Sequence, residues 1–234
     1  MRIAMWSGPR NLSTAMMYSF GNRQDFAVWD EPFYAPYLKA TGSQHPHSEE
    51  IIAEHDSDPS SVASRCLDTI PDEKSHFYMK HMPHHMIDGF PLDWAKSCTN
   101  IHLIRHPARV AASYGVKRET MALEDIGFQQ QLDLFGQLGG LIVDSADIRE
   151  NPEAMLRLLC DSIDLPFDEA MLAWPAGPHP NDGVWAKHWY NAVHKSTGFA
   201  GAEGPLPELT KEQAEIVEQA LPAYDALAQR RLKL

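Results

Sequence analysis

The chain has 234 residues and a mass of 26.3 kDa, which suits a single domain over residues 1–234 whose core needs no disulfide or metal. Its composition, 44% hydrophobic and 22% charged, excludes disorder, collagen and coiled coil, and it holds no apolar run near the ~18 residues of a membrane span. The net charge of −12 argues against a general nucleic-acid coat, so we expect neither a nucleic acid nor a membrane as partner.

Short apolar runs alternate with helical patterns along the chain. The expected strands are 2–6, 26–29, 75–81, 101–105 and 141–144, and the expected helices are 13–20, 107–117, 152–161 and a last helix after Thr210. Asn151 is the expected N-cap of the third helix, and Thr210 with Gln213 has the spacing of a capping box. Segments 32–73 and 164–209 are expected to be irregular. This order predicts an α/β fold of three layers, with a mainly parallel sheet between helices.

Three cysteines, Cys66, Cys98 and Cys160, stand far apart and form neither a metal pattern nor a disulfide framework. We expect three buried thiols in a reducing compartment, and therefore a cytoplasmic protein. The first residues break too soon into Gly, Pro and Arg to be a signal peptide.

Positive charge gathers in four stretches without acids, 1–23, 74–87, 101–118 and 183–202. They hold 11 of the 20 cations, namely Arg2, Arg10, Arg23, Lys74, Lys80, Arg105, Arg109, Lys117, Arg118, Lys187 and Lys195. If the fold brings these stretches together, one cationic cleft forms and attracts an anionic ligand. Alternatively, the acids simply gather on exposed helices.

The first predicted loop has the features of a phosphate cradle. It lies between a strand and a helix, where free N–H groups and the helix dipole attract anions. Arg10, Ser13 and Thr14 add a planar cation and two hydroxyls. It is not a Walker A loop, because Leu12 and Ser13 stand where that motif needs Gly-Lys. An ordinary turn capped by serine is the alternative.

Two segments resemble motifs of sulfotransferases that use 3′-phosphoadenosine 5′-phosphosulfate (PAPS). The first loop resembles their 5′-phosphosulfate loop, although Leu12 replaces the usual glycine. A strand ending in Arg105, with His106-Pro107 and then Ser113, resembles their 3′-phosphate motif, although His106 replaces the usual acid. Spacing also allows Arg105 and Ser113 to converge on one phosphate. A salt bridge and a solvated hydroxyl are the alternatives.

Two further matches extend the resemblance over most of the chain. Residues 141–144, Asn151-Pro152 and Leu165-Pro166 are similar to the family scaffold. Residues 194–199 sit where many members close a loop over the 3′-phosphate, but a surface turn is equally consistent. The chain is thus identified as a member of the bacterial sulfotransferase-like proteins, some labelled aminotransferase-like. The resemblance implies that the three-layer fold is P-loop NTPase-like. It also implies PAPS as cofactor, with PAP, 3′-phosphoadenosine 5′-phosphate, as product. The cofactor-binding residues it implies are Ser7, Gly8, Arg10, Asn11, Leu12, Ser13, Thr14, Arg105, Ser113, Lys195, Ser196 and Gly198.

The resemblance implies transfer of a sulfuryl group to a hydroxyl or amine of a small-molecule acceptor, without a metal. Lys80 is similar to the family lysine at the phosphosulfate, and Arg10 would share its role at the leaving group. Glu31, which follows the second strand, is the favoured base, and His81 is the rival. For Glu31, a capping or salt-bridged acid is the alternative.

Other aromatic and histidine side chains carry weaker predictions. His81 and His85 have the spacing of metal ligands on a helix, but no third ligand is obvious, so these histidines and His84 are expected to line the acceptor pocket or face solvent. Trp185 and Trp189 are expected to pack in the core or to stack on the adenine.

Three other functions compete with catalysis by a sulfotransferase. A catalytically inactive nucleotide-binding or regulatory protein on the same fold stays open, given Leu12 and His106. A histidine phosphatase is suggested by Arg105-His106, but that family needs Arg-His-Gly near the N-terminus. A P-loop kinase lacks its lysine.

Overall fold

A parallel sheet of five strands forms the centre of the fold. The computed structural model describes residues 1–115 and 121–234. The strand order is β2-β3-β1-β4-β5, and every pairing is parallel. The strands are β1 (Arg2–Ser7), β2 (Phe26–Asp30), β3 (His76–His81), β4 (Thr99–Ile104) and β5 (Leu141–Asp144). All five predicted strands are confirmed within two residues at each end.

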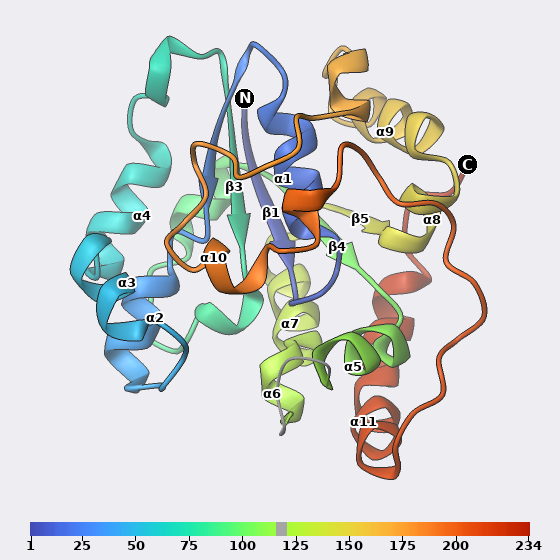
Figure 1. Ribbon diagram of the computed structural model, residues 1–234. Coiled ribbons are helices and arrows are strands. Elements are labelled where there is room, and N and C mark those ends of the chain that lie inside the picture. The colour runs from blue at the N-terminus through green and yellow to red at the C-terminus, as the bar shows by residue number, and fades with distance from the viewer. Residues whose placement is uncertain (116–120) are drawn as a thin grey trace.

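Helices cover both faces of this sheet (Figure 1). The α-helices are α1 (Ser13–Gly21), α2 (Tyr34–Thr41), α3 (Ser48–Glu54), α4 (Pro59–Leu67), α5 (Pro107–Gly115), α6 (Leu123–Ile126), α7 (Phe128–Leu138), α8 (Ser145–Glu150), α9 (Pro152–Asp161), α10 (Ala186–Trp189) and α11 (Lys211–Ala228). The 3₁₀ helices are η1 (Pro71–Glu73), η2 (Pro83–His85), η3 (Asp93–Ser97), η4 (Glu169–Leu172) and η5 (Val193–Lys195). The predicted three-layer α/β fold is confirmed.

Alternation along the strands assigns side chains to two cores. In β1, Ile3 and Met5 pack with α1 and α9 on one face, whereas Ala4 and Trp6 pack with α4, η3 and α7 on the other. Because both faces are covered, most strand residues are apolar, as the sequence indicated.

The predicted helices 13–20, 107–117 and 152–161 and the last helix appear as α1, α5, α9 and α11. The amide of Ala154 donates to the side chain of Asn151, and Thr210 and Gln213 form the predicted capping box. The predicted end of the second helix at Lys117, and the cation Arg118, lie outside the described residues.

The prediction of an irregular segment 32–73 is wrong, because α2, α3, α4 and η1 lie within it. The start of α4 shows the missed signal: Asp58 accepts a hydrogen bond from the amide of Ser60, and Pro59 occupies the first helical position. Segment 164–209 contains only short helices, η4, α10 and η5, as expected.

All three cysteines are free thiols. Cys66 and Cys160 are buried as predicted, but Cys98 is only half-buried at the start of β4. Within residues 1–115 and 121–234, no helix is long and apolar enough to cross a membrane.

The chain order places a binding position beside β1. From β1 the chain passes through α1 to β2 at one edge, whereas the other neighbour of β1 is β4. Ligands in open α/β sheets bind at the carboxyl ends of strands where the strand order reverses in this way. The loops after β1, β3 and β4 meet at this end.

Candidate active site

A cavity of about 340 Å³ opens at the carboxyl ends of β1, β3 and β4. Its walls include residues from the first loop, from β3 and from the ends of β4 and α5. Nine of the predicted site residues up to Ser113 line it: Arg10, Asn11, Leu12, Ser13, Thr14, Glu31, Lys80, Arg105 and Ser113. The fold thus brings side chains from distant parts of the sequence to one cavity.

Two residues of the first loop have a left-handed backbone conformation although neither is a glycine. Leu12 has a φ of 72°, in the left-handed region, and it precedes the first residue of α1. Arg10 also has a positive φ, of 63°. Gly8 passes so close to α6 that a Cβ at this position would lie 2.6 Å from the carbonyl oxygen of Ile126. Ser13, Thr14 and Ala15 line the cavity, so the first turn of α1, whose N–H groups have no partner within the helix, lies at the cavity.

The left-handed conformation of Leu12 has a measurable cost. We expect Leu12→Gly to be more stable than Leu12→Ala by about 1 kcal/mol, because both variants lose the leucine side chain beyond Cβ and only glycine adopts positive φ freely. Urea unfolding of the two variants measures the difference. Equal midpoints, or a more stable alanine variant, would contradict the backbone described for this loop.

Arg10, Arg105 and Ser113 converge on the cavity. Arg105 Nη1 donates to the carbonyl oxygen of Arg10 at 2.7 Å, and Arg10 Nε donates to Ser113 Oγ at 2.8 Å. Arg105 Nε is buried and has no hydrogen-bond partner within the described part of the chain. Burial, and then the neighbouring charge of Arg105, lower the pKa of Arg10. His106 accepts a hydrogen bond from the amide of Ala108 at 3.2 Å, so it caps α5 in place of an acid.

The sequence analysis assigned Arg105 to the site but did not predict the arginine cluster to which it belongs. It consists of Arg105 at the end of β4, Arg109 on α5 and Arg149 on α8, and all three pair with the carboxylate of Glu203. Glu203 is the first acid after the acid-free stretch 183–202, which was the one available signal. Arg149 lies outside the four stretches and had no local signal.

A second cluster, the Lys80 cluster, lies where β2 and β3 end. Lys80 and Asp30 are register partners on adjacent strands, and Lys80 Nζ lies 2.9 Å from Asp30 Oδ1 and 2.6 Å from Glu31 Oε1. It also donates to the hydroxyl of Tyr190, which in turn donates to Asp30 Oδ2 at 2.8 Å. Glu31 has a φ of 44°, and this turn brings its carboxylate back toward Lys80. All these side chains are buried.

Charge balance sets the protonation of the Lys80 cluster. Burial alone would lower the pKa of Lys80, but the Asp30 and Glu31 carboxylates outweigh it and raise that pKa. Burial raises the pKa of Glu31; Lys80 opposes the shift and Asp30 adds to it. The cluster therefore holds an ammonium ion beside a carboxylate with an elevated pKa.

The sequence profile of a sulfotransferase domain matches residues 1–231. The chain belongs to the sulfotransferase domain family. Two Arabidopsis thaliana proteins, named branched-chain-amino-acid aminotransferase-like proteins 2 and 1, are each 34% identical to it over 230 residues. The match covers 96% of the chain but only 41% of each plant protein, so the chain spans about two fifths of their length.

Solved sulfotransferase structures share this fold. The sulfotransferase domain from the curacin biosynthetic pathway aligns with a TM-score of 0.55 at 16% identity, covering 93% of this chain and 96% of that one. The sulfotransferase from Alicyclobacillus acidocaldarius aligns with a TM-score of 0.54 at 12% identity, covering 98% and 96%. At these identities the likeness concerns the fold alone.

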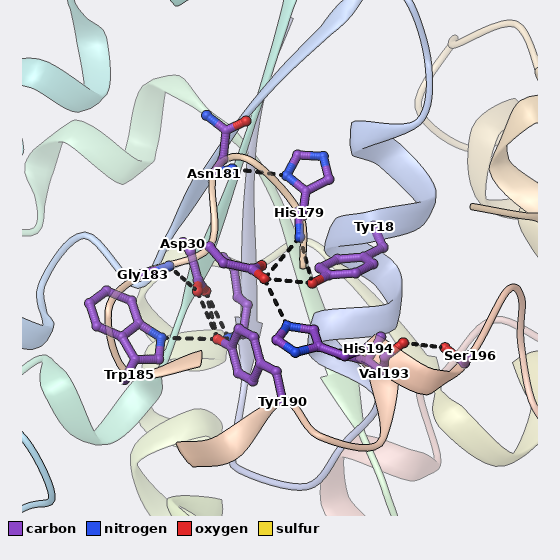
Figure 2. A network of polar contacts seen from close by, with 12 residues as sticks. Tyr18, Asp30, His179, Asn181, Gly183, Trp185, Tyr190, Val193, His194 and Ser196 are labelled. Carbon is purple, nitrogen blue, oxygen red and sulfur yellow. Dashed lines mark hydrogen bonds and ion pairs between the residues drawn. The ribbon is translucent and has the colours of Figure 1, made fainter. Parts of the chain in front are cut away.

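A polar network in the sulfotransferase domain fastens segment 179–196 over the Lys80 cluster (Figure 2). Asp30 accepts hydrogen bonds from Tyr190 and from the amide of Gly183, and Trp185 Nε1 donates to the Tyr190 hydroxyl. Asp182 accepts from the Tyr18 hydroxyl on α1 at 2.6 Å and pairs with His194 at 3.0 Å. This segment therefore forms one wall of the cavity.

The remaining predicted binding residues divide into two groups. Ser196 and Gly198 line the cavity, although the Ser196 hydroxyl is already bonded to the carbonyl oxygen of Val193. Ser7, Gly8 and Lys195 do not line it: Ser7 is buried and bonds to the carbonyl oxygen of Gly8, and Lys195 is exposed. Of the predicted cations that the structure describes, only Arg10, Lys80 and Arg105 line the cavity, and Arg109 lies close by.

His81 is the one predicted catalytic residue that the fold does not bring to the cavity. Neighbouring strand residues point to opposite faces, so His81 points away from Lys80 and packs between Trp6 and Trp94. Neither ring nitrogen has a hydrogen-bond partner among the described residues. Burial lowers the pKa of His81 to about 3, and Glu31 is therefore the candidate base that reaches the cavity.

The buried neutral His81 makes stability depend on pH. Below the pKa of His81 in the unfolded chain, near 6.5, the unfolded chain binds a proton that the folded chain does not bind. Acid therefore destabilises the fold. Between pH 6.5 and 4.5, we expect the unfolding free energy of wild type to fall by about 2–3 kcal/mol more than that of His81→Leu. Urea unfolding of wild type and variant at both pH values measures this. An equal loss of unfolding free energy in wild type and variant would contradict the assignment of this pH dependence to His81.

The other end of the cavity carries aromatic and histidine rings. Tyr34 and His85 stack there with ring centroids 4.6 Å apart, and His84 and Trp189 also line it. Burial lowers the pKa of His85 well below its usual value, so its ring is neutral. Trp185 instead packs in a buried cluster with Tyr34 and Tyr190. In residues 1–115 and 121–234, no group of three or more His, Cys, Asp and Glu side chains is arranged to hold a metal.

Proposed function

We propose that this domain transfers a sulfuryl group from PAPS to a hydroxyl or amine of a small-molecule acceptor. The observation that carries the proposal is a single cavity with three parts. The first loop and Arg105 with Ser113 form an anion-binding wall, Lys80 and Glu31 stand beside it, and aromatic rings form the other end. We include in the proposal that residues 1–234 form one domain and act in the cytoplasm.

The residues at the anion-binding wall fit the donor. PAPS supplies the sulfuryl group and carries two anionic groups. Arg10, Ser13, Thr14 and the first turn of α1 would hold the phosphosulfate, and Arg105 with Ser113 would hold the 3′-phosphate. Two observations support this fit: Arg105 Nε is buried without a partner in the described residues, and the Glu203 carboxylate already lies against Arg105 as an anion would.

The Lys80 cluster supplies the groups that the transfer needs. Lys80 Nζ and Arg10 place positive charge beside the position where negative charge develops on the leaving group. Glu31 accepts the proton of the acceptor, and burial raises its pKa toward the range in which a carboxylate works as a base. Asp30 and Tyr190 hold Lys80 in place through two further hydrogen bonds.

The test is the formation of PAP from PAPS in the presence of a panel of phenols, alcohols and amines. We expect turnover with at least one acceptor class, lost in Glu31→Gln while PAP binding is kept. PAP binding by the wild type without turnover on any acceptor would contradict the proposal and support an inactive nucleotide-binding protein on the same fold.

A further inference from the structure

Residues 200–209 join the cavity wall at Gly198 to α11. This linker segment contains no helix or strand, and in Figure 1 it runs as a long open loop between α10 and α11. Residues 200–209 make no backbone–backbone hydrogen bond with another residue that the structure describes. Most of the segment is exposed, but the side chain of Glu203 is only 2% exposed. Glu203 is thus the point at which the segment is attached to the body of the domain.

The attachment is made by the arginine cluster. Arg149 Nη1 lies 2.7 Å from Glu203 Oε1 and Arg109 Nε lies 2.8 Å from Oε2, while Arg105 Nη2 also pairs with Oε1. Two of these arginines bind the backbone as well, Arg149 at the carbonyl oxygen of Gly201 and Arg109 at that of Gly204. The segment is therefore held by Arg105, which lines the cavity, and by Arg109 and Arg149, which share the Glu203 carboxylate with it.

The charges of this cluster do not balance. Three guanidinium groups, with side chains 17–21% exposed, surround one carboxylate, and Arg10 adds a fourth positive charge beside Arg105. One carboxylate neutralises only one of them. A phosphate monoester carries up to two negative charges and three acceptor oxygens, so it would satisfy the cluster better than Glu203 does.

We propose that Glu203 is a built-in competitor of the ligand: it occupies the arginine cluster in the free protein and leaves, with residues 200–209, when a phosphate monoester binds there. The inference rests on the proposed function, because the monoester it concerns is the 3′-phosphate of PAPS or PAP. It also assigns Arg109 and Arg149, in addition to Arg105, to the binding of that group.

With competition of this kind, the apparent affinity equals the intrinsic affinity multiplied by the fraction of molecules in which Glu203 has left the cluster. We therefore expect Glu203→Gln, which keeps the shape and removes the charge, to bind PAP about tenfold more tightly than wild type. AMP, which has no 3′-phosphate, should bind both proteins equally. Glu208→Gln is the matched control, since it makes the same charge change at an exposed position of the same segment. Calorimetric titration measures all three proteins.

A second measurement uses the wild-type chain, so that the folding of a variant does not matter. A protease specific for glutamate should cut after Glu203 several times faster when PAP is present, because binding releases the segment. Slower cutting would show that the segment closes over the ligand and would overturn the inference.

The outcomes separate this inference from the proposed function. If wild type binds PAP through Arg105 but Glu203→Gln binds it equally or more weakly, Glu203 holds the arginines in place and the inference is wrong while the function stands. If no protein in the series binds PAP, both fail. If Glu203→Gln binds PAP more tightly than wild type and Glu208→Gln does not, the result supports both the inference and the proposed function.

Discussion

Arg105→Ala is expected to weaken PAP binding by roughly 30-fold to 5,000-fold, the range for removing one partner of a desolvated charged contact. The reason is its position: Arg105 leaves β4 at the cavity, it is held by the carbonyl oxygen of Arg10, and its Nε has no other partner in the described residues. The substitution also removes one contact of Glu203, but the loss of a ligand to the phosphate outweighs this gain.

The effect should depend on the 3′-phosphate. AMP lacks this group, so its affinity should change much less in Arg105→Ala. Arg157→Ala is the control, because Arg157 lies on the outer side of α9 in an exposed pair with Glu153. Calorimetry with both nucleotides gives the comparison. An unchanged PAP affinity in a folded Arg105→Ala sample would remove Arg105 from the site.

Lys80→Met is expected to destabilise the fold by about 3–5 kcal/mol at pH 7, as when one partner of a buried ion pair is removed. It leaves the carboxylates of Asp30 and Glu31 buried and close together with no cation between them. The Tyr190 hydroxyl also loses the ammonium group that it accepts from. Lys96→Met changes the same charge at an exposed site and should have little effect.

The loss in Lys80→Met should shrink as the pH falls. Without Lys80 the pKa of Glu31 rises further above its usual value of 4.5, so the folded variant takes up a proton that the unfolded chain takes up only in more acid solution. Its stability therefore increases, relative to wild type, from pH 7 toward pH 5. Urea unfolding at the two pH values measures this, and a penalty that is constant with pH would show that the carboxylates are not left unpaired.

The strands and the residues that line the cavity could be predicted because their signals are local. An apolar run before Ser7 and a run ending at Arg105 identify buried strands, and parallel strands place their carboxyl ends at one edge. Strand alternation was also available and would have removed His81 from the candidates, since it directly follows Lys80.

The residues that the sequence reading missed depend on tertiary contacts. Arg149 and Glu203 are 54 residues apart, and Lys80 and Tyr190 are 110 apart, so no spacing rule connects them. The left-handed backbone of Leu12 has the same origin, because a leucine shows no preference for positive φ. Its side chain instead packs against the core cluster on the α1 side of the sheet, which is a tertiary contact.

The central claim is that this cavity binds a nucleotide that carries a 3′-phosphate. The most direct measurement is calorimetric titration of the purified protein with PAP, without added metal, with AMP and ATP as controls. We predict saturable binding of PAP that AMP and ATP do not match. Equal binding of AMP and PAP, or no binding of PAP by a folded sample, would contradict the account.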